Sequence, residues 1–495
     1  MSLPAEATPI TAATASAAAA AAANALRAVD LPMLQAALEL QRRACARDPV
    51  PSCDERRADL AALRRFILEN REALIDAVNR DYGSRSRHET LFAELVPVLD
   101  GIRHARRHLR RWMRPQRRGI DLLLFPGARN RVVPQPLGVV GVIVPWNFPI
   151  NLTFSALTSI FAAGNRALVK LSENSRHFAA LLIERLPRYF PAEKLAVFDE
   201  TGGVGVAFSR LAVDHLLFTG STQTGRSVMA AAAGNLCPVT LELGGKSPAL
   251  VCEDFPLRTA AERILFVKLL NAGQICTTVD YLWLPRKHLV EFVAHARRIV
   301  ADRYASIASA DYTAIIDDSA FERLTCAILE ARRRGVQVVQ LLPGAPWDAA
   351  TRKIAPHLVI DPPPECELMQ REIFGPVLPV LGYEQLDEAV QFINARPRPL
   401  AFYPFSHRRA RIQYLLERVM SGGVSVNDAL WHVGQHDLPF GGVGASGMGH
   451  YHGADGFLTF SKLRPVFYQA PLSGMRLLWP PFGALADRVL DFLTR

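Results

Sequence analysis

Three side chains of this sequence have the types needed for chemistry at a carbonyl carbon. Cys276 closes the stretch NAGQIC and offers a thiol nucleophile, Glu242 in LELGGK offers a carboxylate base, and Asn147 in PWNF offers an amide donor. Singly, each has a structural explanation: an inert buried thiol, an ion-paired carboxylate and a helix-capping amide. Together, a nucleophile, a base and a donor to an oxyanion are sufficient for acyl chemistry.

A second group of residues predicts a dinucleotide site. Lys170 and Glu173 follow a predicted strand in KLSE, where they could hydrogen-bond ribose hydroxyls. In FTGSTQTG, the residues Gly220, Ser221 and Gly225 follow another strand and open a helix, whose free N–H groups and dipole favour a phosphate. A dinucleotide beside a thiol, a base and an amide donor predicts oxidation of a carbonyl compound through a thioester.

These residues need parallel strands to position them. β-branched runs at 139–146, 167–173, 195–200 and 214–221 alternate with helical stretches, which predicts a parallel, doubly wound sheet. A second α/β region begins near 239–252 and includes predicted strands at 281–285, 336–342, 376–383 and 422–428. The expected fold is α/β, with two doubly wound lobes. Ligands of such sheets bind at the carboxyl ends of the strands, where the candidate residues lie.

Composition excludes several other classes of protein. The chain has 495 residues, 49% of them hydrophobic, and a formal net charge of +10. Its densest basic cluster, at 103–118, has no recognition module around it, so we expect a solvent-exposed helix face and no nucleic-acid partner. Seven cysteines without regular spacing predict reduced thiols, a cytoplasmic location and no metal site.

Both ends of the chain differ from this pattern. The Ala-rich stretch 1–30 lacks the basic start of a secretory signal, and we expect a disordered leader. The last segment, 471–495, is amphipathic at helical spacing but is interrupted by prolines and charges, so it does not predict a membrane span. We expect it to pack on the protein's own body; peripheral membrane contact is the minor alternative.

The motifs resemble the aldehyde dehydrogenase superfamily. The matching stretches occur in the family's order over residues 135–465: PWNFP, KLSE, FTGSTQTG, LELGGKSP, NAGQIC, EIFGP and LPFGGVGASGMG. The chain is most similar to the class 3 branch and, within it, to the bacterial coniferyl-aldehyde dehydrogenase group. Seven ordered motifs make a chance match negligible.

The resemblance implies a role for each motif. Cys276 would attack the aldehyde carbon, Asn147 and the backbone N–H of Cys276 would bind the oxyanion, and Glu242 would activate water to release the acid. The resemblance assigns the cofactor to the five residues of the predicted dinucleotide site and to three further ones, with Glu372 and Phe374 at the nicotinamide ribose. The cofactor-binding residues it implies are Trp146, Lys170, Glu173, Gly220, Ser221, Gly225, Glu372 and Phe374. A carboxylate at Glu173 would repel a 2′-phosphate, so we expect NAD, with NADP as the alternative.

The resemblance also implies a small β element for oligomerisation and a homodimer. We divide the chain into a leader (1–30), an NAD-binding domain (31–113 and 135–240), a catalytic domain (241–430), a bridging element (114–134 and 431–470) and a C-terminal tail (471–495).

The substrate is less determined than the reaction. The stretch NDALWH departs from the group's NDTLLH-like pattern at Ala429 and Trp431, where the class 3 branch lines its substrate entrance. A tryptophan there could favour a flat aromatic aldehyde such as coniferyl aldehyde or narrow the tunnel. The alternatives are a medium- or long-chain aliphatic aldehyde, transfer of the thioester to coenzyme A, which the presence of Glu242 disfavours, and an inactive nucleotide-binding relative.

Overall fold

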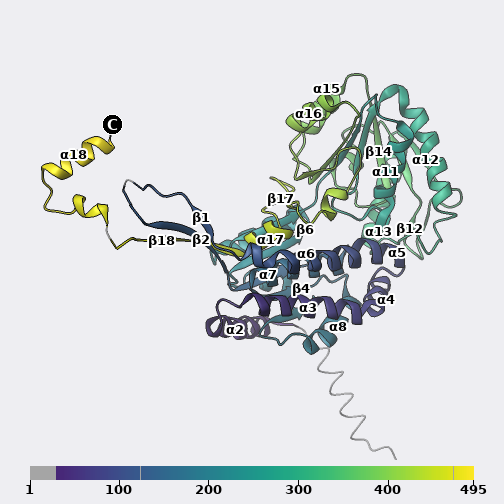
Figure 1. The fold of residues 1–495 in the computed structure, drawn as a ribbon. Coiled ribbons are helices and arrows are strands. Elements are labelled where there is room, and N and C mark those ends of the chain that lie inside the picture. The colour runs from purple at the N-terminus through teal and green to yellow at the C-terminus, as the bar shows by residue number, and fades with distance from the viewer. Residues whose placement is uncertain (1–28, 123, 472, 495) are drawn as a thin grey trace, which may run out of the picture.

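The computed structural model describes residues 29–122, 124–471 and 473–494. It has two α/β lobes and a thin β-sheet arm that extends from the first lobe (Figure 1). Residues 1–28 of the predicted leader lie outside the described residues. The predicted fold class, two α/β lobes with a small additional β element, is confirmed.

The first lobe is built on a six-stranded sheet in the order β17-β7-β6-β3-β4-β5. Strands β3 to β7 are parallel, and β17 is an antiparallel edge strand paired with β7. All residues of β3 are buried, as expected for a strand covered on both faces. The strands are β3 (Val139–Ile143), β4 (Arg166–Lys170), β5 (Leu195–Phe198), β6 (His215–Gly220), β7 (Val239–Leu243) and β17 (Gly447–Met448).

Helices cover both faces of this sheet. Val139 and Ile143 of β3 point to the side of α2, α9 and α10, whereas Val140 and Val142 point to α3, α6, α7 and α8. Helix α7 is buried on nearly all sides and lies between the sheet and the outer helices. The helices are α2 (Leu31–Arg47), α3 (Cys53–Glu69), α4 (Arg71–Tyr82), α5 (Arg87–Thr90), η1 (Leu91–Leu95), α6 (Val96–Trp112), α7 (Pro149–Ala163), α8 (Arg176–Arg185), η2 (Leu186–Arg188), α9 (Val204–Ser209), α10 (Thr222–Ala233) and α17 (Gly453–Thr459).

The second lobe has a seven-stranded sheet in the order β10-β13-β14-β9-β8-β15-β16, parallel except for β10. Its strands are β8 (Pro248–Val251), β9 (Tyr281–Pro285), β10 (Gln337–Gln340), β13 (His357–Ile360), β14 (Val377–Tyr383), β15 (Ala401–Phe405) and β16 (Gly423–Val424), with a separate hairpin of β11 (Trp347–Asp348) and β12 (Lys353–Ile354). Its helices are α11 (Leu257–Leu269), η3 (Leu270–Gly273), η4 (Arg286–His288), α12 (Leu289–Arg303), α13 (Asp318–Arg333), α14 (Glu367–Gln370), α15 (Leu386–Asn394), α16 (Arg409–Arg418) and η5 (Trp431–Gly434).

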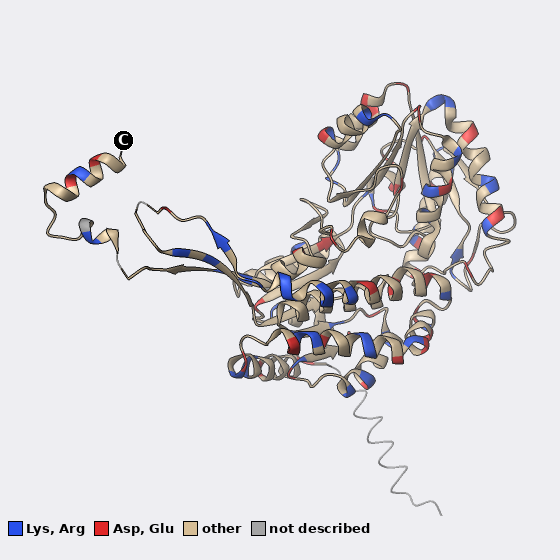
Figure 2. Ribbon diagram, in the orientation of Figure 1, with Lys and Arg blue, Asp and Glu red and all other residues tan. Residues whose placement is uncertain are grey.

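The arm is an antiparallel sheet in the order β1-β2-β18, formed by β1 (Gln116–Arg118), β2 (Arg129–Pro136) and β18 (Ser461–Tyr468). Basic residues lie along it (Figure 2). The arm brings together the two segments predicted to form the bridging element. The homodimer expected through this element stays a prediction.

The C-terminal segment continues from the arm as η6 (Gly474–Leu478) and α18 (Ala484–Leu493). The expectation that this segment packs on the protein's own body is wrong. It lies at the far end of the arm (Figure 1), and the large side chains Trp479, Phe482 and Phe492 are exposed. Only Ala486 of α18 is buried. The arm, rather than the helix's own amphipathic pattern, decides where this segment lies.

The domain boundaries stay a prediction, but the sheet membership differs from them in two places. Strand β7 pairs with β6, so the first sheet continues to Leu243, beyond the expected boundary at 240. Strand β17 and helix α17, expected in the bridging element, belong to the first lobe, because β17 pairs with β7 and Phe457 of α17 packs in the core beside α7. No helix among the described residues is long and apolar enough to cross a membrane.

Candidate active site

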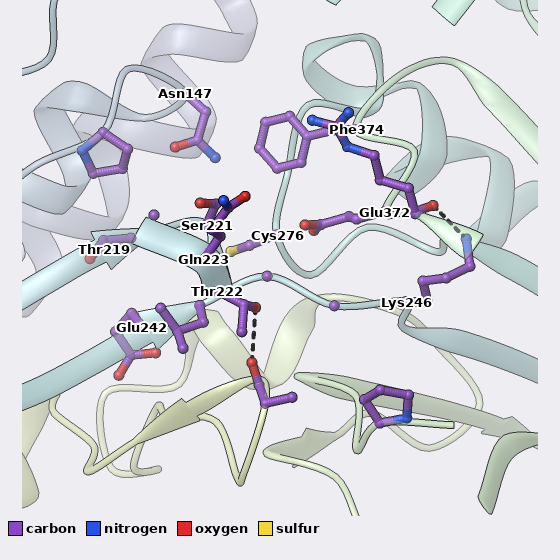
Figure 3. A pocket seen from close by; sticks show the side chains of 18 of the residues that line it. Asn147, Thr219, Ser221, Thr222, Gln223, Glu242, Lys246, Cys276, Glu372 and Phe374 are labelled. Carbon is purple, nitrogen blue, oxygen red and sulfur yellow. Dashed lines mark hydrogen bonds between the residues drawn. The ribbon is translucent and has the colours of Figure 1, made fainter. Parts of the chain in front are cut away.

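A pocket of about 1250 Å³ lies where the two lobes meet. Its lining combines the ends of β3, β6 and β7 from the first lobe with loops of the second lobe (Figure 3). The predicted site residues that line it are Trp146, Asn147, Gly220, Ser221, Glu242, Cys276, Glu372 and Phe374. The folded chain therefore collects residues more than 200 positions apart in sequence around one cavity.

Cys276 is carried by a tightly bent loop that follows α11. Asn271, Ala272 and Gly273 have φ values of 51°, 51° and 77°, three consecutive residues in the left-handed region. Glycine is required at 273, because a Cβ there would overlap the carbonyl group of Gly375. The bend ends α11 and leaves Cys276 half-buried at the pocket wall.

Burial, with a smaller effect of two nearby carboxyl groups, favours the protonated thiol of Cys276. Desolvation, with smaller contributions from Glu372 and Glu242, raises the pKa of Cys276 to about 12. At neutral pH the group is therefore a thiol and needs a base before it can act as a nucleophile.

Glu242 lies on β7 opposite Gly447 of β17 and is buried. Neither of its carboxyl oxygens has a hydrogen-bond partner among the described residues. Desolvation raises the pKa of Glu242 well above its ordinary value, so the neutral acid is favoured over the carboxylate. A buried carboxyl group without a partner is costly in a folded protein, which is typical of a group kept for chemistry.

Glu372 follows α14 and faces Cys276 in the pocket (Figure 3). Burial and the nearby charge of Asp280 raise the pKa of Glu372 to about 8, against the opposing effects of a backbone hydrogen bond from Gly245 and of Lys246 and Arg323. The sequence expectation assigned Glu372 to the cofactor only. Its position makes it a second carboxyl group beside the thiol.

Asn147 lies between β3 and α7 and is buried. Its side-chain Nδ2 donates to the carbonyl oxygen of Gln274, two residues before Cys276, at 3.3 Å. Trp146 and Phe374 line the pocket next to it, with ring centroids 5.5 Å apart and the rings edge to face. The amide group is therefore close to the Cys276 loop.

The start of α10 could hold a dinucleotide phosphate. Ser221 caps the helix by accepting a hydrogen bond from the N–H of Thr224 at 3.2 Å. As first residues of the helix, Thr222 and Gln223 present N–H groups that have no acceptor within it. Gly225 packs against β7, where a Cβ would lie 2.6 Å from Leu243, so its role is close helix–strand contact.

Lys170 and Glu173 do not line the pocket. Lys170 is buried and forms an ion pair with Glu200, while Glu173 is exposed and accepts a hydrogen bond from Ser172. Their assignment to the adenosine ribose stays a prediction.

Several pocket residues were not predicted. Lys246 was quoted in LELGGK without a role; its Nζ forms an ion pair with Asp280 and donates to the carbonyl oxygens of Leu368 and Arg371 at 2.7 and 3.0 Å. Five arginines add further cations to the lining: Arg226, Arg323, Arg371, Arg396 and Arg398. No spacing pattern marks these arginines, so only the folded chain reveals them.

Gly244 offers a direct test of the Glu372 position. A Cβ on Gly244 would overlap the Glu372 carboxyl group. If Glu372 binds the nicotinamide ribose, as the resemblance implies, Gly244→Ala is expected to displace its carboxyl group and raise the KM for the cofactor about tenfold, since loss of a hydrogen bond to a charged group costs roughly 1.5–3 kcal/mol. Gly245→Ala is the matched control, because its Cβ would meet nothing closer than 3.5 Å. Equal KM values in the two variants would contradict the prediction; steady-state kinetics with varied NAD measures them.

The fold and the pocket agree with one family of proteins. The family model described as "Aldehyde dehydrogenase family" matches residues 5–466, and the chain belongs to this family. It is an aldehyde dehydrogenase, an oxidoreductase.

Two curated relatives are similar over nearly the whole chain. A protein named "Probable coniferyl aldehyde dehydrogenase" from Pseudomonas aeruginosa is 46% identical over 462 residues, which cover 93% of this chain and 96% of the relative. "Coniferyl aldehyde dehydrogenase" from Pseudomonas sp. is 43% identical over 464 residues, with the same coverage. Among solved structures, AldH of Staphylococcus aureus in a substrate-bound state has a TM-score of 0.87 and 31% identity, and covers 93% of this chain and 99% of that one.

Proposed function

We propose that the protein oxidises an aromatic aldehyde of the coniferyl type to its carboxylic acid, with NAD or NADP as hydride acceptor and Cys276 as nucleophile. The observation that carries the proposal is that Cys276, Asn147 and Glu242 line one and the same pocket. The names of the two curated relatives support the substrate class.

The first step requires removal of the Cys276 proton. Because burial raises the pKa of the Cys276 thiol to about 12, a base has to accept its proton; Glu242 and Glu372 line the same pocket, and either can do so only in its deprotonated form. The sulfur then bonds to the aldehyde carbon, and the carbonyl π electrons move to oxygen. Asn147 Nδ2 and the N–H of Cys276 are the donors for that oxyanion, and preorganised donors of this kind are a large source of rate enhancement.

The second half of the reaction converts the thiohemiacetal into the acid. Loss of hydride leaves a thioester on Cys276. Glu242, as a carboxylate, takes a proton from water, whose oxygen attacks the thioester carbon and displaces the Cys276 sulfur. The carboxyl group must be deprotonated to act, and its raised pKa makes it a stronger base once it is.

The pocket is suited to a nicotinamide dinucleotide. When bound, this cofactor accepts the hydride that the aldehyde loses. The N-terminus of α10 would hold its phosphates, and Lys246, Arg226 and Arg323 supply positive charge along the lining. One carboxyl oxygen of Glu372, Oε1, is buried and has no hydrogen-bond partner among the described residues. It could accept a hydrogen bond from a ribose hydroxyl.

An aromatic cluster supports an aromatic substrate. Phe92, Phe266 and Trp431 have ring centroids 5.9–6.2 Å apart, and Phe266 and Trp431 are stacked at 18°. Each ring is more than a third exposed, which is unusual for side chains of this size. Offset stacking on such surfaces is favourable for another flat ring.

This aromatic cluster is connected to the nucleophile loop. Ala93 and Leu430, next in sequence to two of the rings, pack against the buried group of Phe148, Leu270 and Ile275. Since Ile275 precedes Cys276, the rings and the thiol are linked by one apolar layer.

The test is reduction of NAD and of NADP by the purified protein with coniferyl aldehyde, benzaldehyde, hexanal and a long-chain aldehyde. The proposal expects the highest kcat/KM with the aromatic aldehydes. A higher kcat/KM with the aliphatic aldehydes would show that the substrate is aliphatic and not aromatic. If an acyl-coenzyme A product forms when coenzyme A is added, the thioester is transferred to coenzyme A and not hydrolysed by water.

Trp431→Ala gives a sharper test of the aromatic cluster. We expect kcat/KM for coniferyl aldehyde to fall about tenfold, because an aromatic pair contributes roughly 0.5–1.5 kcal/mol beyond simple burial. The value for hexanal should change little. Trp479→Ala, in the C-terminal tail, is the control for loss of an exposed tryptophan. An equal fall for both substrates would remove the argument for aromatic specificity.

A further inference from the structure

The main-chain carbonyl oxygen of Asn147 is held by three side chains. Tyr82 Oη donates to it at 3.0 Å, Arg85 Nη1 at 2.9 Å and Asn271 Nδ2 at 3.3 Å. A carbonyl oxygen has two lone pairs and usually accepts one or two hydrogen bonds, so three donors fix the position of this oxygen closely.

Arg85 is itself rigidly placed. Its guanidinium lies between two aromatic rings, 4.8 Å from the centroid of Tyr82 and 4.9 Å from that of Phe148. Its Nη2 lies 3.2 Å from Oε1 of Glu94, and neither side chain of this ion pair is exposed to solvent. The geometry leaves Arg85 little freedom to move away from Asn147.

Glu94 extends the contact to the helix that follows Asn147. Its Oε2 accepts hydrogen bonds from the N–H groups of Ile150 at 2.7 Å and Asn151 at 3.0 Å, in the first turn of α7. A carboxylate is favourable at this end of a helix. The ion pair therefore holds the carbonyl group of Asn147 and the first turn of the helix that follows it, which limits the direction in which the Asn147 side chain leaves the backbone.

Asn271 connects the same network to the nucleophile loop. Its Nδ2 also donates to the carbonyl oxygen of Gln274 at 3.1 Å, the oxygen that accepts the hydrogen bond from Asn147 Nδ2. The Asn147 amide and the loop that carries Cys276 thus belong to one hydrogen-bonded unit that joins the two lobes.

We propose that Arg85, with Glu94, is a positioning residue that sets the orientation of Asn147 toward the oxyanion. The proposal rests on the function of Asn147 proposed above. Arg85 does not line the pocket and acts only through Asn147. A buried ion pair contributes little to stability compared with apolar residues of similar volume, whereas misplacement of a catalytic group by about 1 Å can cost on the order of a hundredfold in rate.

The test compares Arg85→Met with a control at the opposite end of α7. Arg56 is equally buried and donates to the carbonyl oxygens of Ala162 and Ala163 at 3.2 and 2.8 Å, so Arg56→Met disturbs the same helix far from Asn147. We expect Arg85→Met to lower kcat by about 10- to 100-fold with an unchanged KM for NAD. Arg56→Met should lower the Tm without this loss of kcat. Arg85→Lys, which keeps the charge but lacks the planar fork, should be intermediate.

A double-mutant cycle separates positioning from general damage. In the Asn147→Ala background, Arg85→Met should cause no further loss of kcat, because its effect passes through Asn147. Multiplicative losses, or a loss of kcat in Arg56→Met as large as in Arg85→Met, would overturn the proposal. If Arg85→Met does not fold, the double variant Arg85→Met with Glu94→Gln takes its place in the same cycle. This variant removes both buried charges and so leaves neither one unpaired.

The same cycle keeps this inference distinct from the function on which it rests. Full kcat in Asn147→Ala would refute the assignment of Asn147 as oxyanion donor. A large loss in Asn147→Ala together with unchanged kcat in Arg85→Met would refute the positioning role alone.

Discussion

Cys276→Ala is expected to lower aldehyde oxidation at least about 10⁴-fold, because removal of a catalytic nucleophile leaves only binding and oxyanion stabilisation. The change removes one sulfur from a half-buried position at the pocket wall, so the Tm should change little. If the variant still binds NAD, as measured by quenching of protein fluorescence, the pocket is intact. Cofactor reduction with the best aldehyde of the panel is the measurement.

Cys326→Ala is the matched control, since Cys326 is an exposed free thiol outside the pocket. Its activity should equal that of the unchanged protein. Cys276→Ser adds a second comparison, because a hydroxyl in the same place is harder to deprotonate than a thiol. Activity in Cys276→Ala above about a thousandth of the original would contradict the nucleophile assignment.

Much of the candidate site could be predicted because its residues lie in short motifs at strand ends. In parallel sheets the carboxyl ends of strands share one edge, so Asn147, Ser221 and Glu242 had to come close once the strands were identified. The sequence could not indicate the Arg85 network. Arg85 and Asn147 are 62 residues apart and belong to a loop and a turn without periodicity.

Two strands of the second sheet that the sequence did not indicate, β13 and β15, share one feature, which is proline within or beside the strand. β15 contains Pro404, and β13 is only four residues long between prolines at 356 and 362. Proline lacks a backbone donor and argues against a central strand, yet both segments pair within the second sheet. Tertiary packing here overrides a local signal.

The raised pKa values of three neighbouring groups imply a pH profile. Cys276, Glu242 and Glu372 all favour their neutral forms, and each must lose a proton to act as a nucleophile, a base or an anion. Catalysis should therefore fall as pH decreases below neutrality and rise into the alkaline range. The same two carboxyl groups make stability change with pH in the direction opposite to catalysis. Folding raises their pKa, so their contribution to stability is most favourable at low pH, where both are protonated, and is lost as the pH rises through their folded-state pKa values.

Glu242→Gln is expected to lower kcat by roughly 10²–10⁴-fold, the usual contribution of a general base. Glutamine keeps the size of the side chain but cannot take a proton from water, so the thioester on Cys276 should accumulate. Rapid mixing should then show one equivalent of reduced cofactor formed quickly per Cys276, followed by slow turnover. The dependence of kcat on the ionisation of Glu242 should disappear, and so should the corresponding loss of stability at alkaline pH.

A slow first turnover without a burst would mean that Glu242 acts before hydride loss, as the base for the thiol. An unchanged kcat would transfer the role of base to Glu372, the half-buried carboxyl group that faces Cys276.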